Sequence, residues 1–231
     1  MHTMTIGWTT VIFRRFDIMA CLVCVTFFLI WPQFDLSFSR NFYDEASQSF
    51  MWREHFVTQF IYQLTNVIAG TLVIGLPCLL AGSYVFRNKL LSKYKKVFIF
   101  MFCTCILGPG VVVNSVLKDH WERPRPVQSI EFGGSNAFEP PFSPQFACKE
   151  CYSFVSGHAS VGFAFFSLAL LCRNRRWLLV PAALGTVIGM TRIVQGGHFF
   201  SDVLFSGWVV WFCTLLLHYL FYEYGKSSKL N

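Results

Sequence analysis

Charged residues are scarce in this sequence. They make up 13% of the 231 residues, against about 25% in a typical soluble domain, and the mean hydropathy is +0.48. A composition so poor in charge excludes a disordered chain and a coiled coil, and it disfavours an ordinary soluble enzyme.

Several long runs contain no Asp, Glu, Lys or Arg at all. They cover residues 18–31, 56–86, 97–117, 177–191 and 203–222. In the run 153–172, the one side chain that titrates near neutral pH is His158. Because a helix needs about 20 apolar residues to cross a bilayer, we predict an all-α integral membrane protein with a bundle of six transmembrane helices. The helices are expected at 16–32, 56–86, 97–117, 154–172, 177–194 and 203–222.

Two further absences narrow the class. The expected spans carry no acid or base near their centres, which argues against an ion-coupled transporter. The first apolar run is followed by Trp31, Pro32 and Gln33, where a cleaved signal peptide would have small residues. We therefore expect the first run to be a retained helix.

The charges that are present divide between the two sides of the predicted bundle. Counted from the N-terminus, the connections on one side carry 12 basic residues against two acidic ones, a net charge of +10. The other side carries seven basic and ten acidic residues, a net charge of −3. This asymmetry is typical of the positive-inside rule, so both termini are expected in the cytoplasm. Since the basic residues alternate with apolar spans, a nucleic-acid partner is not expected.

Nine cysteines are present, but seven lie in or beside apolar runs, where they behave as small buried hydrophobes. Cys148 and Cys151 differ, because they lie in the polar segment 118–153 on the outer side. Two thiols are too few for a structural zinc site. They predict either a disulfide in an oxidising compartment or a pair of free thiols.

Three short stretches rich in basic residues and histidine lie at the outer ends of the expected helices. They are Lys118–Pro126 after the third span, Val155–His158 before the fourth, and Thr191–Asp202 between the fifth and sixth. Lys118, Arg125 and Arg192 suit a doubly charged anion, since arginine offers a bidentate fork and lysine a point charge. Ser156 and Gly157 open a helix, where free backbone N–H groups can donate hydrogen bonds to phosphate oxygens.

The histidines of these stretches suit nucleophilic and acid catalysis. His198 and Asp202 are four residues apart, so at the head of the sixth helix they share a face. A carboxylate there can hold one imidazole nitrogen and leave the other to attack. His158 is then free to protonate a leaving oxygen.

Each stretch alone has a plainer interpretation. Arg125 between two prolines fits an extended linker, Ser156 fits a helix cap, and an exposed His–Asp pair fits simple helix stabilisation. His55, His120 and His218 are given no role. The three stretches together, in this order and on one side of the membrane, indicate a catalytic site.

At these residues the sequence resembles the type 2 phosphatidic acid phosphatase superfamily. The resemblance is carried by Lys118-x6-Arg125-Pro126, by Ser156-Gly157-His158 and by Arg192-x5-His198-x3-Asp202. It implies metal-free phosphoester hydrolysis through a phosphohistidine. His198 would be the nucleophile, Asp202 its orienting partner and His158 the general acid. The phosphoryl group would be bound by Lys118, Arg125, Ser156, Gly157 and Arg192. Val155 and Thr191 stand where the family usually has Pro and Ser.

Further residues are similar to the bacterial lipid A 4′-phosphatases, namely those around Gly108-Pro109-Gly110, after Lys118 and between Gln195 and Asp202. The resemblance implies one membrane-embedded lipid phosphatase domain over residues 1–231, with no metal or cofactor. It would act on a lipid phosphate, most closely the 4′-phosphate of lipid A, in the inner membrane with its site facing the periplasm. Membrane lipids would be its other partners, and no oligomeric state is predicted.

Three alternatives remain open. Within the same class they are a phosphatase of phosphatidylglycerophosphate or undecaprenyl pyrophosphate, and a lipid phosphotransferase. From a different class comes a membrane protein that only binds lipid phosphate, although binding alone does not need His158, His198 and Asp202.

Overall fold

The computed structural model describes residues 8–87, 89–143, 151–172 and 174–224 of the protein. Its long helices are α1 (Trp8–Ile30), α3 (Phe56–Gly70), α4 (Leu76–Val85), α5 (Lys89–Cys105), α9 (Leu179–Val194) and α10 (Phe200–His218). Its shorter helices are α2 (Phe34–Arg40), α6 (Lys118–Trp121), α7 (Gly157–Phe163) and α8 (Phe166–Leu171). Two short antiparallel strands, β1 (Tyr43–Asp44) and β2 (Ser49–Phe50), pair Tyr43 with Phe50.

The helices are joined or extended by tighter and wider turns. Wider π-helical segments are η1 (Thr71–Gly75), η2 (Ile106–Leu117) and η6 (Tyr219–Glu223). Tighter 3₁₀ turns are η3 (Pro126–Gln128), η4 (Ile130–Phe132) and η5 (Arg175–Leu178). Thus α3, η1 and α4 form one long continuous helix, and α5 and η2 form another.

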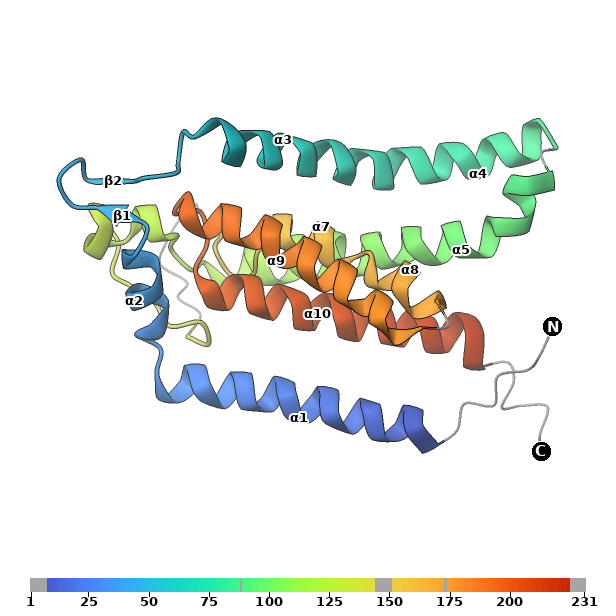
Figure 1. Ribbon diagram of the computed structural model, residues 1–231, viewed down its shortest axis with the longest axis horizontal. Helices are drawn as coiled ribbons and strands as arrows, with labels where there is room; N and C mark the ends of the chain where they lie inside the picture. The colour runs from blue at the N-terminus through green and yellow to red at the C-terminus, as the bar shows by residue number, and fades with distance from the viewer. Residues whose placement is uncertain (1–7, 88, 144–150, 173, 225–231) are drawn as a thin grey trace.

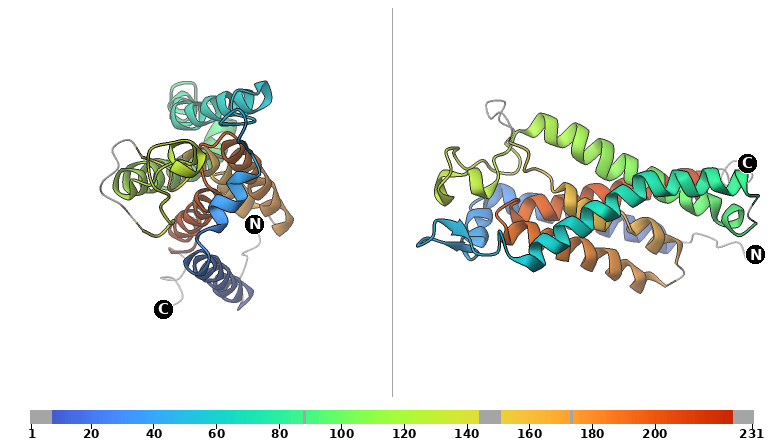
Figure 2. Two further views of the ribbon diagram at one scale, coloured as in Figure 1. Left: turned by 90° about the vertical axis from the view of Figure 1, so that its left-hand side faces the viewer. Right: turned by 90° about the horizontal axis from the view of Figure 1, so that it is seen from above.

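The long helices run side by side along the length of the molecule (Figure 1). The α3–α4 helix and α1 lie at opposite edges, with α9 and α10 between them (Figure 2). The segments predicted to be outer, including α2, the two strands and residues 118–143, gather at the left end of Figure 1. The α4–α5 connection and both ends of the described chain lie at the right end. The two sides predicted from charge are therefore opposite ends of the bundle, while their compartments remain a prediction.

Within the part of the chain that the structure describes, four helical segments are long and apolar enough to cross a membrane, so this is a multi-pass membrane protein. They are Phe56–Val85, Leu91–Leu117, Arg175–Val194 and Phe200–Glu223. A fifth is obtained if Phe16–Ile30 is counted with Phe34–Arg40, from which it is bent by 84°. The expected fourth span is shorter than predicted, since Gly157–Leu171 measures about 22 Å at 1.5 Å per residue, less than the bilayer core. The count of six spans therefore stays a prediction.

Pro109 lies inside the helical segment that ends at Leu117, between Gly108 and Gly110. The helix accommodates it by widening into η2 rather than ending. Asn114 then donates its side-chain N–H to the Pro109 carbonyl oxygen at 2.7 Å, which satisfies a backbone acceptor at this irregular point. The same widened segment delivers Lys118 to the outer end of the bundle.

Small residues let α7 lie close against α9. A Cβ atom on Gly162 would lie 2.7 Å from the Gly185 Cα atom, so any larger side chain would push the two helices apart. The N-terminus of α7 and the C-terminus of α9 are both at the outer end. This contact therefore fixes where His158 stands relative to Arg192.

Candidate active site

Backbone hydrogen bonds tie the three sequence stretches together at the outer end of the bundle. Ser153 N–H donates to the Arg123 carbonyl at 3.0 Å, and Val127 N–H donates to the Gly196 carbonyl at 3.1 Å. Ser156 N–H donates to the Asp202 carbonyl at 3.0 Å. Segments up to about 80 positions apart in sequence thus form one frame, and the side chains they carry have fixed relative positions.

His198 is buried in this frame, with 3% of its surface exposed. Its Nδ1 atom lies 2.8 Å from the carbonyl oxygen of Ser153. Because a carbonyl can only accept, Nδ1 carries the proton and Nε2 holds the free electron pair. Burial, opposed in part by Asp202, lowers the pKa of the imidazole to about 4, so the ring is neutral at neutral pH.

Asp202 is also buried, and its carboxylate lies beside His198 without a direct hydrogen bond to it. The distance from His198 Nδ1 to Asp202 Oδ2 is 3.6 Å. Oδ2 instead accepts from the Phe199 N–H at 2.7 Å and from the Ser153 hydroxyl at 2.5 Å. Asp202 therefore acts on His198 through its charge and through Ser153, whereas the sequence predicted a direct orienting bond.

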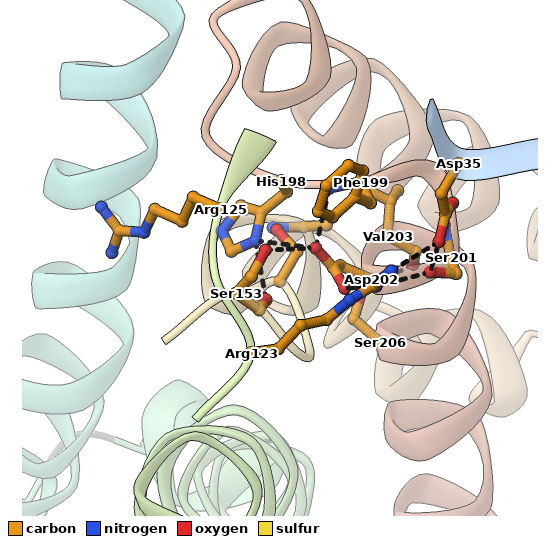
Figure 3. A network of polar contacts seen from close by, with 12 residues as sticks. Asp35, Arg123, Arg125, Ser153, His198, Phe199, Ser201, Asp202, Val203 and Ser206 are labelled. Atoms are coloured by element: carbon orange, nitrogen blue, oxygen red, sulfur yellow. Dashed lines mark hydrogen bonds and ion pairs between the residues drawn. The ribbon is translucent and has the colours of Figure 1, made fainter. Parts of the chain in front are cut away.

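Arg123, which the sequence analysis gave no role, supports that carboxylate from the other side (Figure 3). Its guanidinium is fully buried and donates to Asp202 Oδ1 at 2.5 Å and to Asp35 Oδ2 at 2.8 Å. The Ser201 hydroxyl accepts a further bond from Arg123, and Asp35 accepts the Ser201 N–H at 2.9 Å. One arginine thus joins two buried carboxylates, one from α2 and one from α10. The sequence feature that could have indicated this buried pairing is Asp35, an acidic residue in a segment rich in aromatic residues.

Arg125 and Arg192 face a polar cavity of about 200 Å³ next to this network. Arg192 donates to Gln195 Oε1 at 2.5 Å. The Nε atoms of Arg125 and Arg192 are buried, and neither makes a hydrogen bond to any part of the chain that the structure describes. Buried donors without partners cost free energy, so these two guanidinium groups are suited to an anion in the cavity. In Figure 3, the Arg125 side chain extends away from the Asp202 network.

Lys118, Gly157 and His158 line a second cavity of about 160 Å³. A Cβ atom on Gly157 would lie 2.8 Å from Lys118 Nζ, so a larger residue at this position would displace the end of the lysine side chain from the start of α7. Ser156 is the N-cap of α7, and its hydroxyl accepts from the Ala159 N–H at 3.4 Å. In this structure Ser156 therefore acts as a helix cap, which is the plainer of its two interpretations from the sequence.

His158 was expected to be free, but it has partners on α3. Its Nε2 atom lies 3.1 Å from Asn66 Oδ1, and its ring stacks on that of Tyr62 with centroids 4.5 Å apart. The Arg192 guanidinium also lies over the Tyr62 ring, with its Cζ atom 4.8 Å from the ring centroid. Sequence analysis missed both α3 residues, although Thr58, Tyr62, Thr65 and Asn66 form a polar stripe at helical spacing in an expected span.

The remaining predictions concern metals and cysteines. Among the described residues, no group of three or more His, Cys, Asp or Glu side chains is placed to hold a metal ion. Cys151 is buried and disulfide-bonded. Its predicted partner Cys148 lies outside the described residues, so that pairing stays a prediction.

The sequence is similar to known proteins of one family. The family model of the PAP2 superfamily matches residues 96–226, which contain all three stretches. The chain belongs to the PAP2 superfamily. This PAP2 protein is 36% identical over 210 residues to a lipid A 4′-phosphatase of Francisella tularensis subsp. novicida, covering 89% of the chain and 94% of that relative.

Two relatives from Rhizobium etli match shorter parts of this PAP2 protein. A lipid A 4′-phosphatase is 38% identical over 131 residues, which are 54% of the chain and 51% of the relative. A lipid A 1-phosphatase is 34% identical over 114 residues, which are 47% of the chain and 45% of the relative. No solved structure matches the chain.

Proposed function

We propose that the protein is a lipid phosphatase of the inner membrane that removes the 4′-phosphate of lipid A on the periplasmic face. Two observations carry the chemistry: a buried, neutral His198 whose Nδ1 proton is held by Ser153, and the buried Nε atoms of Arg125 and Arg192, which have no hydrogen-bond partner among the described residues. The choice of lipid rests on the Francisella relative, which matches over nearly its whole length.

The reaction would proceed in two steps. His198 Nε2 attacks phosphorus while the bond to the leaving oxygen breaks, and His158 gives that oxygen a proton. Water then attacks the phosphohistidine and returns its proton to His158, which releases inorganic phosphate and restores the free imidazole. Lys118, Arg125 and Arg192 would balance the phosphoryl charge, and the Ser156 hydroxyl and the Gly157 N–H would donate hydrogen bonds to phosphate oxygens.

Mass spectrometry of lipid A, before and after incubation with the purified protein, tests the substrate. We expect the loss of one phosphoryl group, with fragmentation placing the loss at the 4′ position. Loss from the 1 position would agree instead with the Rhizobium lipid A 1-phosphatase match. Phosphatidic acid as a second substrate separates a general lipid phosphatase from a selective one. A protein that binds both lipids and hydrolyses neither would be a binding protein only.

Two alanine variants test the assigned roles. His198→Ala should be inactive on every substrate, because the covalent route is lost. His158→Ala should lose about 10²–10⁴-fold on a lipid phosphate and recover much of the parent rate on an activated aryl phosphate, whose leaving oxygen needs little protonation. Equal losses on both substrates would assign the acid role to another group.

The periplasmic placement is tested separately from the chemistry. A cytoplasmic C-terminus is expected from the +10 charge of the connections on its side. A C-terminal fusion should therefore report from the cytoplasm, and a reporter placed between β1 and β2 should report from the periplasm. The reverse pattern would place the site in the cytoplasm.

A further inference from the structure

Two α3 side chains contact predicted site residues, and neither belongs to the three stretches that carry the family resemblance. The Tyr62 ring contacts both the His158 ring, with centroids 4.5 Å apart at an interplanar angle of 27°, and the Arg192 guanidinium, whose Cζ lies 4.8 Å from the Tyr62 centroid. Asn66, one helical turn further along, presents Oδ1 to His158 Nε2 at 3.1 Å. The α3 helix is thus a wall of the site, although it lies before the region that the family model matches.

The bond to Asn66 determines which nitrogen of His158 can take part in proton transfer. Oδ1 of an amide can only accept, so His158 Nε2 must carry a proton. That nitrogen is occupied, and Nδ1 is the one left to exchange a proton with substrate. The sequence assigned the acid role to His158 without saying which nitrogen performs it.

We propose that Asn66 and Tyr62 are positioning residues, Asn66 holding His158 so that Nδ1 donates to the leaving oxygen and Tyr62 holding His158 and Arg192 in register. The inference rests on the proposed function. As the bond from phosphorus to the leaving oxygen breaks, the proton of Nδ1 passes to that oxygen and Nε2–H stays on Asn66. In the second step, Nδ1 takes a proton from the attacking water.

The charges around His158 give Asn66 a specific task. Burial, followed by the effects of Arg192, His198, Lys118 and Arg125, lowers the pKa of the His158 imidazole to about 3. Residues 56–70 of α3 contain no charged side chain, so what faces the ring from that helix is the partial negative charge of the Asn66 oxygen and the Tyr62 ring face. Charged His158 should therefore form mainly when the phosphate dianion is bound, with the Asn66 oxygen stabilising it.

The first test compares Asn66→Ala and Asn66→Asp with Gln63→Ala, an exposed polar position on the same helix. Asn66→Ala should lower kcat by about tenfold on a lipid phosphate and by less than about twofold on an activated aryl phosphate. Asn66→Asp keeps the shape and the acceptor but adds a negative charge. It should move the alkaline limb of the kcat profile upward by about one pH unit. Gln63→Ala should match the parent on both substrates.

The second test concerns Tyr62, whose ring makes the contacts with His158 and Arg192 described above. Tyr62→Phe should therefore keep the parent kinetics. Tyr62→Leu should raise KM for the phosphate about threefold or more through Arg192 and also lower kcat through His158. The split between the two parameters separates it from Asn66→Ala, which should leave KM unchanged.

Results that overturn the inference are distinct from failure of the proposed function. If the parent hydrolyses lipid phosphate but Asn66→Asp leaves the alkaline limb in place, Asn66 does not position the acid. The inference is also refuted if Asn66→Ala loses the same factor of activity on both substrates, or if Tyr62→Phe loses as much activity as Tyr62→Leu. A parent with no hydrolysis of either substrate refutes the proposed function instead. The isosteric Asn66→Asp variant keeps the test decisive even if Asn66→Ala folds poorly.

Discussion

His198 Nδ1 lies 2.8 Å from the carbonyl oxygen of Ser153 and 3.6 Å from the nearest Asp202 oxygen. In a serine protease triad, a carboxylate selects the tautomer of the catalytic histidine. Here a backbone carbonyl performs that selection. The Asp202 carboxylate is linked to His198 only indirectly, because it accepts a hydrogen bond from the hydroxyl of the same Ser153. The difference changes what is expected when the carboxylate is altered.

Asp202→Asn should cost kcat less than about 10³-fold, whereas loss of the correct tautomer costs about 10⁴-fold in a triad with a direct carboxylate bond. The reason is that Ser153 still holds the Nδ1 proton when Asp202 is neutral. The variant should also unfold more easily, since either amide orientation turns its N–H₂ toward a donor. Turnover of an aryl phosphate, normalised to the folded fraction, measures the effect. A loss as large as that of His198→Ala would mean that Asp202 sets the tautomer.

The pH profile should show an unusually low acid limb. Since burial lowers the pKa of His198 to about 4, the imidazole is deprotonated and nucleophilic above about pH 5. Activity assigned to the free enzyme, kcat/KM, should therefore fall only as the pH approaches 4. The second ionisation of a phosphomonoester, near a pKa of about 6, adds a limb of its own. Two aryl phosphates of different second pKa identify the substrate limb, because it moves with the substrate. An immobile limb near 6.5 would contradict the assignment.

Arg123→Met should destabilise the protein by about 3–5 kcal/mol, because it leaves Asp35 and Asp202 buried without their shared cation. Arg40→Met is the matched control, since it removes an exposed arginine at the same end of the bundle. Thermal or denaturant unfolding in detergent gives the difference. The two variants behaving alike would show that the buried pairs contribute little.

Activity should persist in EDTA, because the three cations Lys118, Arg125 and Arg192 meet the phosphoryl charge in the proposed mechanism. Vanadate, which imitates five-coordinate phosphorus, should inhibit. Dialysis against chelator followed by addition of single divalent ions checks this. Activity that is abolished by EDTA and restored by one metal would refute the metal-free mechanism.

The sequence predicted the parts of the site that repeat at fixed local spacing. The proximity of His198 and Asp202, the cap at Ser156, and Lys118 and Arg125 of the first stretch could all be found in this way, whereas Arg123 of the same stretch was missed. Four of the six expected membrane helices could be found too, because each of them is a long charge-free run that forms a long helix. The length of Gly157–Leu171 could not be predicted from apolarity, since the extended residues 151–156 before it are equally apolar.

The contacts that sequence could not supply are those between distant segments. Asp35 meets Arg123 across 88 positions, and Asn66 meets His158 across 92. No local pattern encodes such a pairing, because it follows from which helices pack together. A polar stripe on α3 and a lone acid in α2 were visible, but they indicate an inward face without naming the partner.

The contact between Asp35 and Arg123 limits how the protein could be truncated or fused to part of a relative. The family-matched region begins at residue 96, yet the arginine that braces its Asp202 takes its second carboxylate from α2. A chimera that grafts residues 96–226 onto the leading helices of another family member should work only if the donor supplies an acid at the position of Asp35. The residues before the family-matched region therefore supply a carboxylate, Asp35, that helps Arg123 to hold Asp202 in place.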